Sequence, residues 1–185
     1  MSPFCAGFVD VPDDVWFAAP VAWAVANGVT NGTDASHFSP NMQCTRGQMV
    51  TFLWRAKCCP EPTQQTSPFE DVADPGAYYY KAVLWAVENG ITRGSSATTF
   101  SPNAPVTRGM VVTFLHRADG DEPPKGSDSP FVDVESWTYY AESVQWAVEQ
   151  KITDGVDPTH FSPDTICTRA QIVTFLQRFM TRAGA

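Results

Sequence analysis

The sequence predicts an all-α protein made of three copies of one helix–loop–helix unit. A segment beginning Phe-x-Asp-Val recurs, each copy holds two apolar stretches with helical spacing, and proline-rich polar spacers separate the copies. The copies span residues 8–56, 69–118 and 131–179. Because two short helices cannot bury their apolar faces alone, we expect the copies to share a core in one compact domain, residues 1–185.

The first helix of each copy follows an aromatic pair and is predicted from its apolar periodicity. One tryptophan per copy lies within that pattern and is expected in the core: Trp23, Trp85 and Trp146. Gly28 and Gly90 end the first two helices, where glycine suits a left-handed stop. Lys151 takes this place in the third copy, so we expect a weaker or differently shaped stop there.

A loop with a glycine at one fixed position connects the two helices. The second helix then begins at a threonine N-cap, and a glutamine three residues later completes a capping box in the first and third copies. The apolar residue before each cap fits a hydrophobic staple, which accounts for Cys44 and Cys167. The loop glycines are Gly32, Gly94 and Gly155; the cap residues are Thr45, Thr107, Thr168, Gln48 and Gln171.

An arginine follows each cap, although a helix amino terminus carries partial positive charge and prefers anions. These residues are Arg46, Arg108 and Arg169. Capping does not need them, so two interpretations remain: contact with an acidic ligand, or ion pairs with the Phe-x-Asp-Val aspartates Asp10, Asp71 and Asp133. A second arginine lies nine residues on, half a turn out of phase, and is expected to point elsewhere, into solvent or an interface: Arg55, Arg117 and Arg178.

Composition narrows the classes of partner. Hydrophobic content of 43% and aromatic content of 12% are typical of globular proteins. The net charge is −8 and no run of basic residues occurs, which argues against nucleic acid or an anionic membrane surface as the main partner. No segment approaches the ~20 apolar residues of a membrane span, so no membrane insertion is expected. The start has no secretory signal, so a protein working outside the cell would have lost its leader.

Cofactor, metal and catalytic chemistry are not expected. His37 and His160 share a loop position that holds Thr99 in the second copy, which argues against zinc. The odd cysteine count, which includes Cys5, has no C-x-x-C, and the vicinal pair Cys58-Cys59 could be a disulfide or two thiols. No nucleophile, metalloprotease or phosphate-loop motif occurs, so we do not expect an enzyme.

The ordered motifs F-x-D-V, an aromatic pair, A-V-x-W-A, G-I-T-x-G, F-x-P-N and T-R-[AG]-Q resemble the S-layer homology module in triplicate. The resemblance implies three repeats about a pseudo-threefold axis with grooves between neighbours. It implies non-covalent anchoring of a bacterial surface protein to cell-wall polysaccharide, often through an acidic, pyruvate-ketal sugar. The module's signature has glutamate where this chain has Gln48, Met110 and Gln171.

The resemblance also assigns site residues. Ligand-binding positions are the three first-turn arginines, the loop glycines and the leading aromatics, and an aromatic here suits either a sugar or internal packing: Trp16, Tyr78 and Tyr139. The aspartates, threonines and glutamines named above are structural or ligand-supporting. The expected location is the bacterial cell surface, with further domains in the full-length protein. The alternative is a protein–protein assembly module, or a fragment of a surface enzyme.

Overall fold

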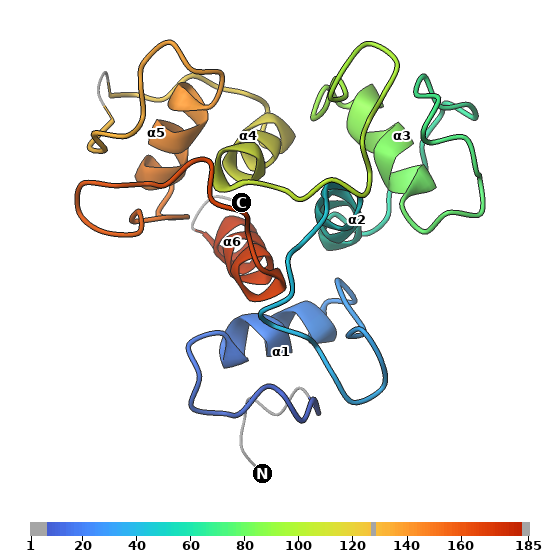
Figure 1. Ribbon diagram of the computed structural model, residues 1–185, viewed down its shortest axis with the longest axis horizontal. Coiled ribbons are helices and arrows are strands. Elements are labelled where there is room, and N and C mark those ends of the chain that lie inside the picture. Colours follow the sequence, from blue (N-terminus) through green and yellow to red (C-terminus); the bar gives the residue numbers. More distant parts are fainter. Residues whose placement is uncertain (1–6, 127–128, 183–185) are drawn as a thin grey trace.

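The computed structural model describes residues 7–126 and 129–182, and within them the regular structure is helical (Figure 1). The six helices are α1 (Ala18–Ala26), α2 (Arg46–Ala56), α3 (Tyr80–Glu88), α4 (Arg108–Ala118), α5 (Ala141–Glu149) and α6 (Arg169–Thr181). Extended pairing in the described residues is limited to isolated bridges. In this part of the chain no helix combines the length and apolar character that a membrane crossing requires. The predicted all-α class is confirmed.

The helices do not pack within their own repeats. The second helices α2, α4 and α6 contact one another at the centre, and the first helices lie outside them (Figure 1). Each first helix packs against the second helix of the preceding repeat: α3 on α2, α5 on α4, and α1 on α6. Each helix–loop–helix unit therefore depends on its neighbours for its apolar contacts, which is why the three units share a core.

The segments that precede the second helices form a closed ring of backbone hydrogen bonds. Cys44 N donates to Cys167 O at 2.9 Å, Val106 N to Cys44 O at 3.0 Å, and Cys167 N to Val106 O at 2.9 Å. All three side chains are fully buried. Repeats one, two and three are thus linked in cyclic order, with repeat three returning to repeat one.

Local capping follows the sequence signals. Thr45 accepts from Gln48 N while Gln48 Oε1 accepts from Thr45 N, and Thr168 and Gln171 form the same capping box. Thr107 caps α4 alone, because Met110 replaces the glutamine. The starts of the second helices are therefore fixed by residues adjacent in the chain.

The ends of the first helices give one correction. Gly28 and Gly90 are left-handed, with φ of 67° and 68°, as expected. Lys151 is left-handed too, with φ of 56°, so the third stop is not shaped differently. The left-handed conformation costs a lysine about 1 kcal/mol, and Lys151 adopts it because the following loop has the same path as the loops after Gly28 and Gly90.

The core contains most of the predicted aromatic residues. Trp85 and Trp146 are buried, whereas Trp23 is only half-buried and packs against the edge of the core. The largest fully buried side chains include one phenylalanine from each Phe-Ser-Pro triplet: Phe38, Phe100 and Phe161. These phenylalanines lie beside the first-turn arginines, as the site geometry shows.

Candidate functional site: grooves between the repeats

Each first-turn arginine crosses from its own helix into the next repeat. Arg46 Nε donates to Phe100 O at 2.9 Å, Arg108 Nε to Phe161 O at 2.8 Å, and Arg169 Nε to Phe38 O at 2.8 Å. The partners are 54, 53 and 131 residues away in sequence. The arginine therefore does not serve its own helix terminus and instead bridges two repeats.

The guanidinium groups are buried between aromatic rings. Arg46, Arg108 and Arg169 are only 6%, 5% and 3% exposed. The Cζ atom of Arg46 lies 4.8 Å from the ring centroid of Phe100 and 5.5 Å from that of Phe114, and the other two arginines have matching pairs of rings. Such contacts favour a cation but compensate only part of its lost hydration.

One nitrogen of each guanidinium remains unpaired. Nη2 of Arg46, Arg108 and Arg169 has no hydrogen-bond partner in the part of the chain that the structure describes. Burial lowers the pKa of all three arginines, yet a guanidinium stays charged at neutral pH. A buried charge without a direct anionic partner is energetically unfavourable.

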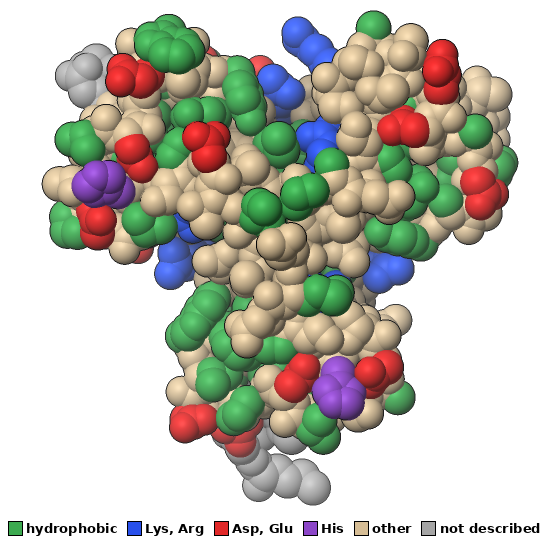
Figure 2. Space-filling model, viewed as in Figure 1, with side chains coloured by type: hydrophobic (Ala, Val, Ile, Leu, Met, Phe, Trp, Pro, Cys, Tyr) green, Lys and Arg blue, Asp and Glu red, His purple; other side chains and the backbone are tan. Residues whose placement is uncertain are grey.

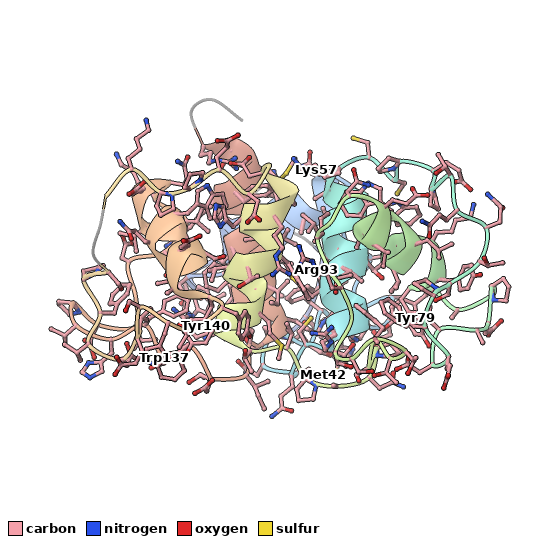
Figure 3. All side chains as sticks on the ribbon, turned by 90° about the horizontal axis from the view of Figure 1, so that it is seen from above. Met42, Lys57, Tyr79, Arg93, Trp137 and Tyr140 are labelled. Atoms are coloured by element: carbon pink, nitrogen blue, oxygen red, sulfur yellow. The ribbon has the colours of Figure 1, made fainter. Side chains whose placement is uncertain are left out.

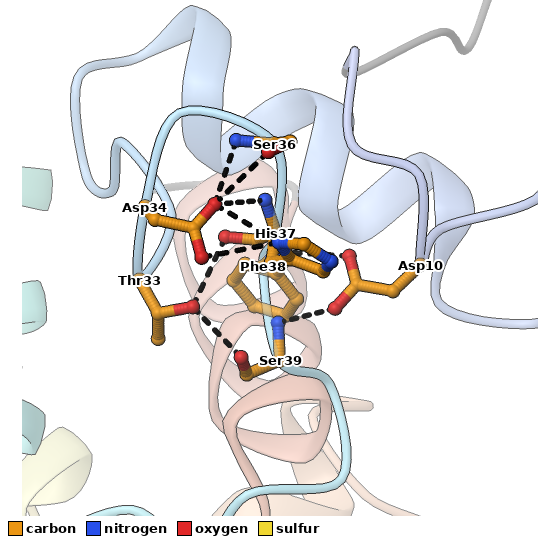
Figure 4. Close-up of polar contacts among 7 residues, drawn as sticks. All are labelled: Asp10, Thr33, Asp34, Ser36, His37, Phe38 and Ser39. Atoms are coloured by element: carbon orange, nitrogen blue, oxygen red, sulfur yellow. Dashed lines mark hydrogen bonds and ion pairs between the residues drawn. The ribbon is translucent and has the colours of Figure 1, made fainter.

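The aspartates of Phe-x-Asp-Val are not the missing partners. The carboxylate of Asp10 accepts from Phe38 N at 2.9 Å and from Ser39 N at 2.7 Å (Figure 4). Asp71 and Asp133 hold the equivalent pairs of N–H groups. Among the described residues these aspartates form no direct ion pair with a first-turn arginine. Burial lowers the pKa of each arginine, and the charge of the aspartate opposes that shift from a greater distance.

Instead, each aspartate supports a strained loop. Ser39, whose backbone N–H donates to Asp10 Oδ2, is left-handed with φ of 59°, and Ser101 and Ser162 are left-handed in the same way. Holding a non-glycine residue there costs on the order of 1–2 kcal/mol. The aspartate offsets that cost with two charge-assisted hydrogen bonds.

Two grooves open beside these arginines, and each is lined from all three repeats. The first, which we name the Arg46 groove, has a volume of about 380 Å³, and its lining includes Arg46, Arg93, Gly94, Met110, Arg117 and Tyr139. The second, the Arg108 groove, has a volume of about 460 Å³, and its lining includes Trp16, Arg108, Gly155, Val156, Gln171 and Arg178. The structure thus brings the predicted arginine, glycine and aromatic positions together, but takes them from different repeats.

The third arginine and aromatic, Arg169 and Tyr78, influence each other as Arg46 and Tyr139 do. Partial burial raises the pKa of Tyr78, and the nearby charge of Arg169 opposes that rise. Burial likewise raises the pKa of Tyr139, against the charge of Arg46 in the Arg46 groove. Tyr78 therefore stands to Arg169 as Tyr139 stands to Arg46.

The leading aromatics project into solvent at these sites. Trp16, Tyr78 and Tyr139 are 63%, 53% and 60% exposed. Their chain neighbours Phe17, Tyr79 and Tyr140 pack inward, and each pair of rings meets edge to face. Internal packing therefore uses the second member of each pair and leaves the first available to a ligand.

The second arginines correct the expectation that they point elsewhere. Arg117 lines the Arg46 groove and Arg178 lines the Arg108 groove. Within α2, the two arginines do have different partners: Arg46 Nε donates to Phe100 O in the next repeat, whereas Arg55 Nη1 donates to Val29 O in its own repeat. The half-turn argument fails for the site, because a groove takes its two arginines from two different repeats. Arg117 Nη1 also donates to Ile91 O at 3.4 Å and Arg178 Nη1 to Ile152 O at 3.1 Å.

The loop glycines have a structural role whatever they bind. Gly94 has φ of 87°, and a Cβ atom there would lie 2.5 Å from Ser96 O and 2.6 Å from Phe69 Cε1. Gly32 and Gly155 are equally crowded. A side chain at these positions is therefore incompatible with the loop that forms the groove wall.

Basic side chains gather where neighbouring repeats meet, whereas acidic ones lie on the outer parts of the repeats (Figure 2). Although the net charge is −8, three arginines line the Arg46 groove and two line the Arg108 groove.

Neither groove has a cysteine or a histidine among its lining residues. Burial raises the pKa of the Cys44 and Cys167 thiols to about 12, so both remain protonated. Cys58 and Cys59 are exposed free thiols, and Cys5 lies outside the described residues. Within the described ranges no three His, Cys, Asp or Glu side chains are placed to share a metal ion.

Comparison with known proteins agrees with the repeats seen in the structure. The family model for the S-layer homology domain matches residues 7–50, 68–109 and 130–173. The chain is 35% identical over 134 residues to a surface-layer 125 kDa protein of Lysinibacillus sphaericus, covering 70% of this chain and 11% of that protein.

Two other relatives belong to different kinds of protein. An endoglucanase of a Bacillus species is 27% identical over 187 residues, covering 96% of this chain and 19% of the enzyme. A cellulosome-anchoring protein of Acetivibrio thermocellus is 28% identical over 105 residues, covering 57% of this chain and 21% of that protein. The chain thus spans about a fifth or less of each relative's length.

The surface-layer relatives confirm the predicted location at the bacterial cell surface. The family model covers well over half of the sequence, in the same three segments that form the helix–loop–helix repeats. The chain therefore belongs to the S-layer homology domain family, with three copies of the domain.

Proposed function

We propose that this chain anchors a bacterial surface protein non-covalently to cell-wall polysaccharide, by binding an acidic sugar group in the grooves between its repeats. Relatives that are surface-layer and cellulosome-anchoring proteins support the anchoring role. The observation that carries the binding mechanism is the buried, unpaired guanidinium Nη2 of Arg46, Arg108 and Arg169.

Each groove supplies complementary groups to such a ligand. The guanidinium meets the carboxylate of an acidic substituent such as a pyruvate ketal. The exposed aromatic, Tyr139 in the Arg46 groove and Trp16 in the Arg108 groove, packs on the face of the sugar ring. Gly94 or Gly155 lies in the wall of each groove, where the tight loop that the glycine permits places backbone beside the sugar.

A pseudo-threefold relation among the repeats is part of this proposal. Equivalent arginine contacts and backbone hydrogen bonds recur from repeat one to two, two to three and three to one. We expect an Arg169 groove with Tyr78, Gly32 and Gln48 as the counterpart of the other two.

Calorimetric titration with purified wall polysaccharide from the source bacterium tests the proposal. The matched variant carries Arg46→Met, Arg108→Met and Arg169→Met, which remove the charges and keep apolar stems beside the phenylalanines. We expect the wild type to bind and the folded variant, checked by circular dichroism, to lose binding at least tenfold, because each guanidinium–carboxylate pair is worth on the order of 1.5–3 kcal/mol.

Equal binding by both proteins would overturn the role of the arginines. Absence of binding by the wild type, together with self-association that depends on protein concentration, would favour the assembly module instead. A wild type that neither binds nor assembles would overturn the anchoring role for these grooves.

A further inference from the structure

One loop position gives the grooves different charges. The residue that follows the buried threonine after the first helix is Asn31 in repeat one, Arg93 in repeat two and Asp154 in repeat three. Arg93 and Asp154 are both exposed, so neither is required for packing. The same backbone path therefore carries a neutral, a positive and a negative side chain.

In the Arg46 groove this position adds a positive charge. Arg93 lines the groove together with Arg46 and Arg117. Figure 3 labels Arg93 in the region between α4 and α2. Arg46 lies at the buried end against Phe100 and Phe114, whereas Arg93 is exposed. The Arg46 groove thus presents one guanidinium in its wall and further ones nearer solvent.

In the Arg108 groove the same position removes a positive charge. Asp154 Oδ2 lies 3.8 Å from Arg178 Nη1, and Arg178 lines that groove. The two side chains are 88% and 46% exposed, so the pair is weak. Asp154 does not line the groove itself, but its carboxylate lies beside a lining arginine, between the lining residues Thr153 and Gly155 in the chain. Arg108 is then the buried guanidinium of that groove, and Asp154 offsets part of the charge of the more exposed Arg178.

We propose that Arg93 makes the Arg46 groove selective for a glycan with a second anionic group beyond the one bound at Arg46, and that Asp154 makes the Arg108 groove prefer a singly charged unit. This inference rests on the proposed function, because it assumes that the grooves bind acidic sugars. A polymer with both kinds of unit can then engage the domain at two sites with different preferences.

Coulombic energies set the size of the effect. Changing Arg93 to aspartate alters the charge by two units, and at about 8 Å in water-like surroundings this weakens binding of one further anionic group roughly fivefold. Such exposed charges are screened over about 8 Å at physiological ionic strength, so the preference should decrease as salt is added.

The test uses two synthetic probes: a methyl glycoside with one pyruvate ketal, and the same glycoside with one additional phosphate monoester. Nuclear magnetic resonance of arginine Nε–Hε groups reports each groove separately, because Nε of Arg46 and of Arg108 is buried and hydrogen-bonded. We expect the added phosphate to raise the affinity reported by the Arg46 signal more than the affinity reported by the Arg108 signal.

Charge-exchange variants sharpen this result. Arg93→Asp should abolish the preference at the Arg46 groove, Asp154→Arg should create one at the Arg108 groove, and Arg93→Asn should fall between. The same phosphate effect at both signals, unchanged by Arg93→Asp, would overturn the selectivity and leave the proposed function intact. Failure of both probes to move any first-turn arginine signal would overturn both.

Discussion

Two charged side chains hold the same loop residue, Phe38, from opposite sides, and only one of them is fully paired. Asp10 from repeat one accepts from Phe38 N and Ser39 N with both carboxylate oxygens. Arg169 from repeat three donates through Nε to Phe38 O, and its Nη2 has no partner in the described part of the chain. The aspartate thus stabilises the loop, whereas the arginine keeps donor capacity that the fold leaves unused.

Asp10 therefore belongs to the structural scaffold and Arg169 to the proposed binding site, although both contact Phe38. If this assignment is correct, changes on the aspartate and glycine side should lower stability, and changes on the arginine side should lower binding. The following substitutions test that separation in order of expected effect.

The largest effect is expected for Gly94→Ala. The new Cβ would meet Ser96 O and Phe69 Cε1 at under 3 Å in a left-handed residue, which should cost about 3 kcal/mol or more of the free energy of unfolding. Gly90→Ala is the matched control, since Gly90 has φ of 68° with nothing within 4 Å, and should cost about 1 kcal/mol. Equal losses in urea unfolding would show that crowding in the loop does not matter.

Asp10→Ala should come next. It leaves two backbone N–H groups of the Phe38 loop without their acceptor, so we expect a loss of about 2–3 kcal/mol in urea unfolding. Asp13, an exposed neighbour in the sequence, provides the control, and Asp13→Ala should change stability by less than about 0.5 kcal/mol. An Asp10→Ala variant with an unchanged free energy of unfolding would contradict the role of Asp10 in stabilising the loop.

Arg169→Met should show the opposite pattern. The lost hydrogen bond to Phe38 O is largely offset by removing a buried, unpaired charge, so stability should change by about 1 kcal/mol or less. Binding in its groove should fall about tenfold, as one charge-assisted contact is lost. Arg169→Lys, titrated in parallel, keeps the charge and should lose less binding affinity. An Arg169→Met variant that binds normally but is clearly destabilised would show that Arg169 is structural.

The smallest effect is expected for Lys151→Gly. Lys151 has φ of 56°, where glycine has no steric cost, so the substitution should raise the free energy of unfolding by about 0.5–1 kcal/mol. The reverse change, Gly90→Lys, should lower it by a similar amount. Because neither residue lines the Arg46 or Arg108 groove, binding should remain unchanged in both.

Local signals made much of the fold predictable. Thr45 with Gln48, and Gly28 at a left-handed stop, act through residues adjacent in the chain, and the structure has both as expected. Repetition of the same signals predicted three helix–loop–helix units and their shared core. Such features need no knowledge of which repeat touches which.

The site was less predictable because it combines distant residues. Periodicity places Arg55 and Arg46 on different sides of α2 but cannot show that Arg117 enters the Arg46 groove from the next repeat. Each first helix packs on the second helix of the preceding repeat, and nothing in the sequence of a single repeat indicates this. The equivalence of Arg117 with Arg55 and Arg178 was visible in the sequence, and their recurrence was the signal that could have suggested a shared role.

The central claim is that the fold leaves its buried first-turn arginines for an external anion. The most direct test is thermal unfolding with and without saturating wall polysaccharide, for the wild type and for the Arg46→Met, Arg108→Met, Arg169→Met variant. A ligand that binds only the folded state raises the melting temperature, so we predict an increase for the wild type and none for the variant. An equal increase in both proteins would contradict the account, because the polysaccharide would then bind without the arginines.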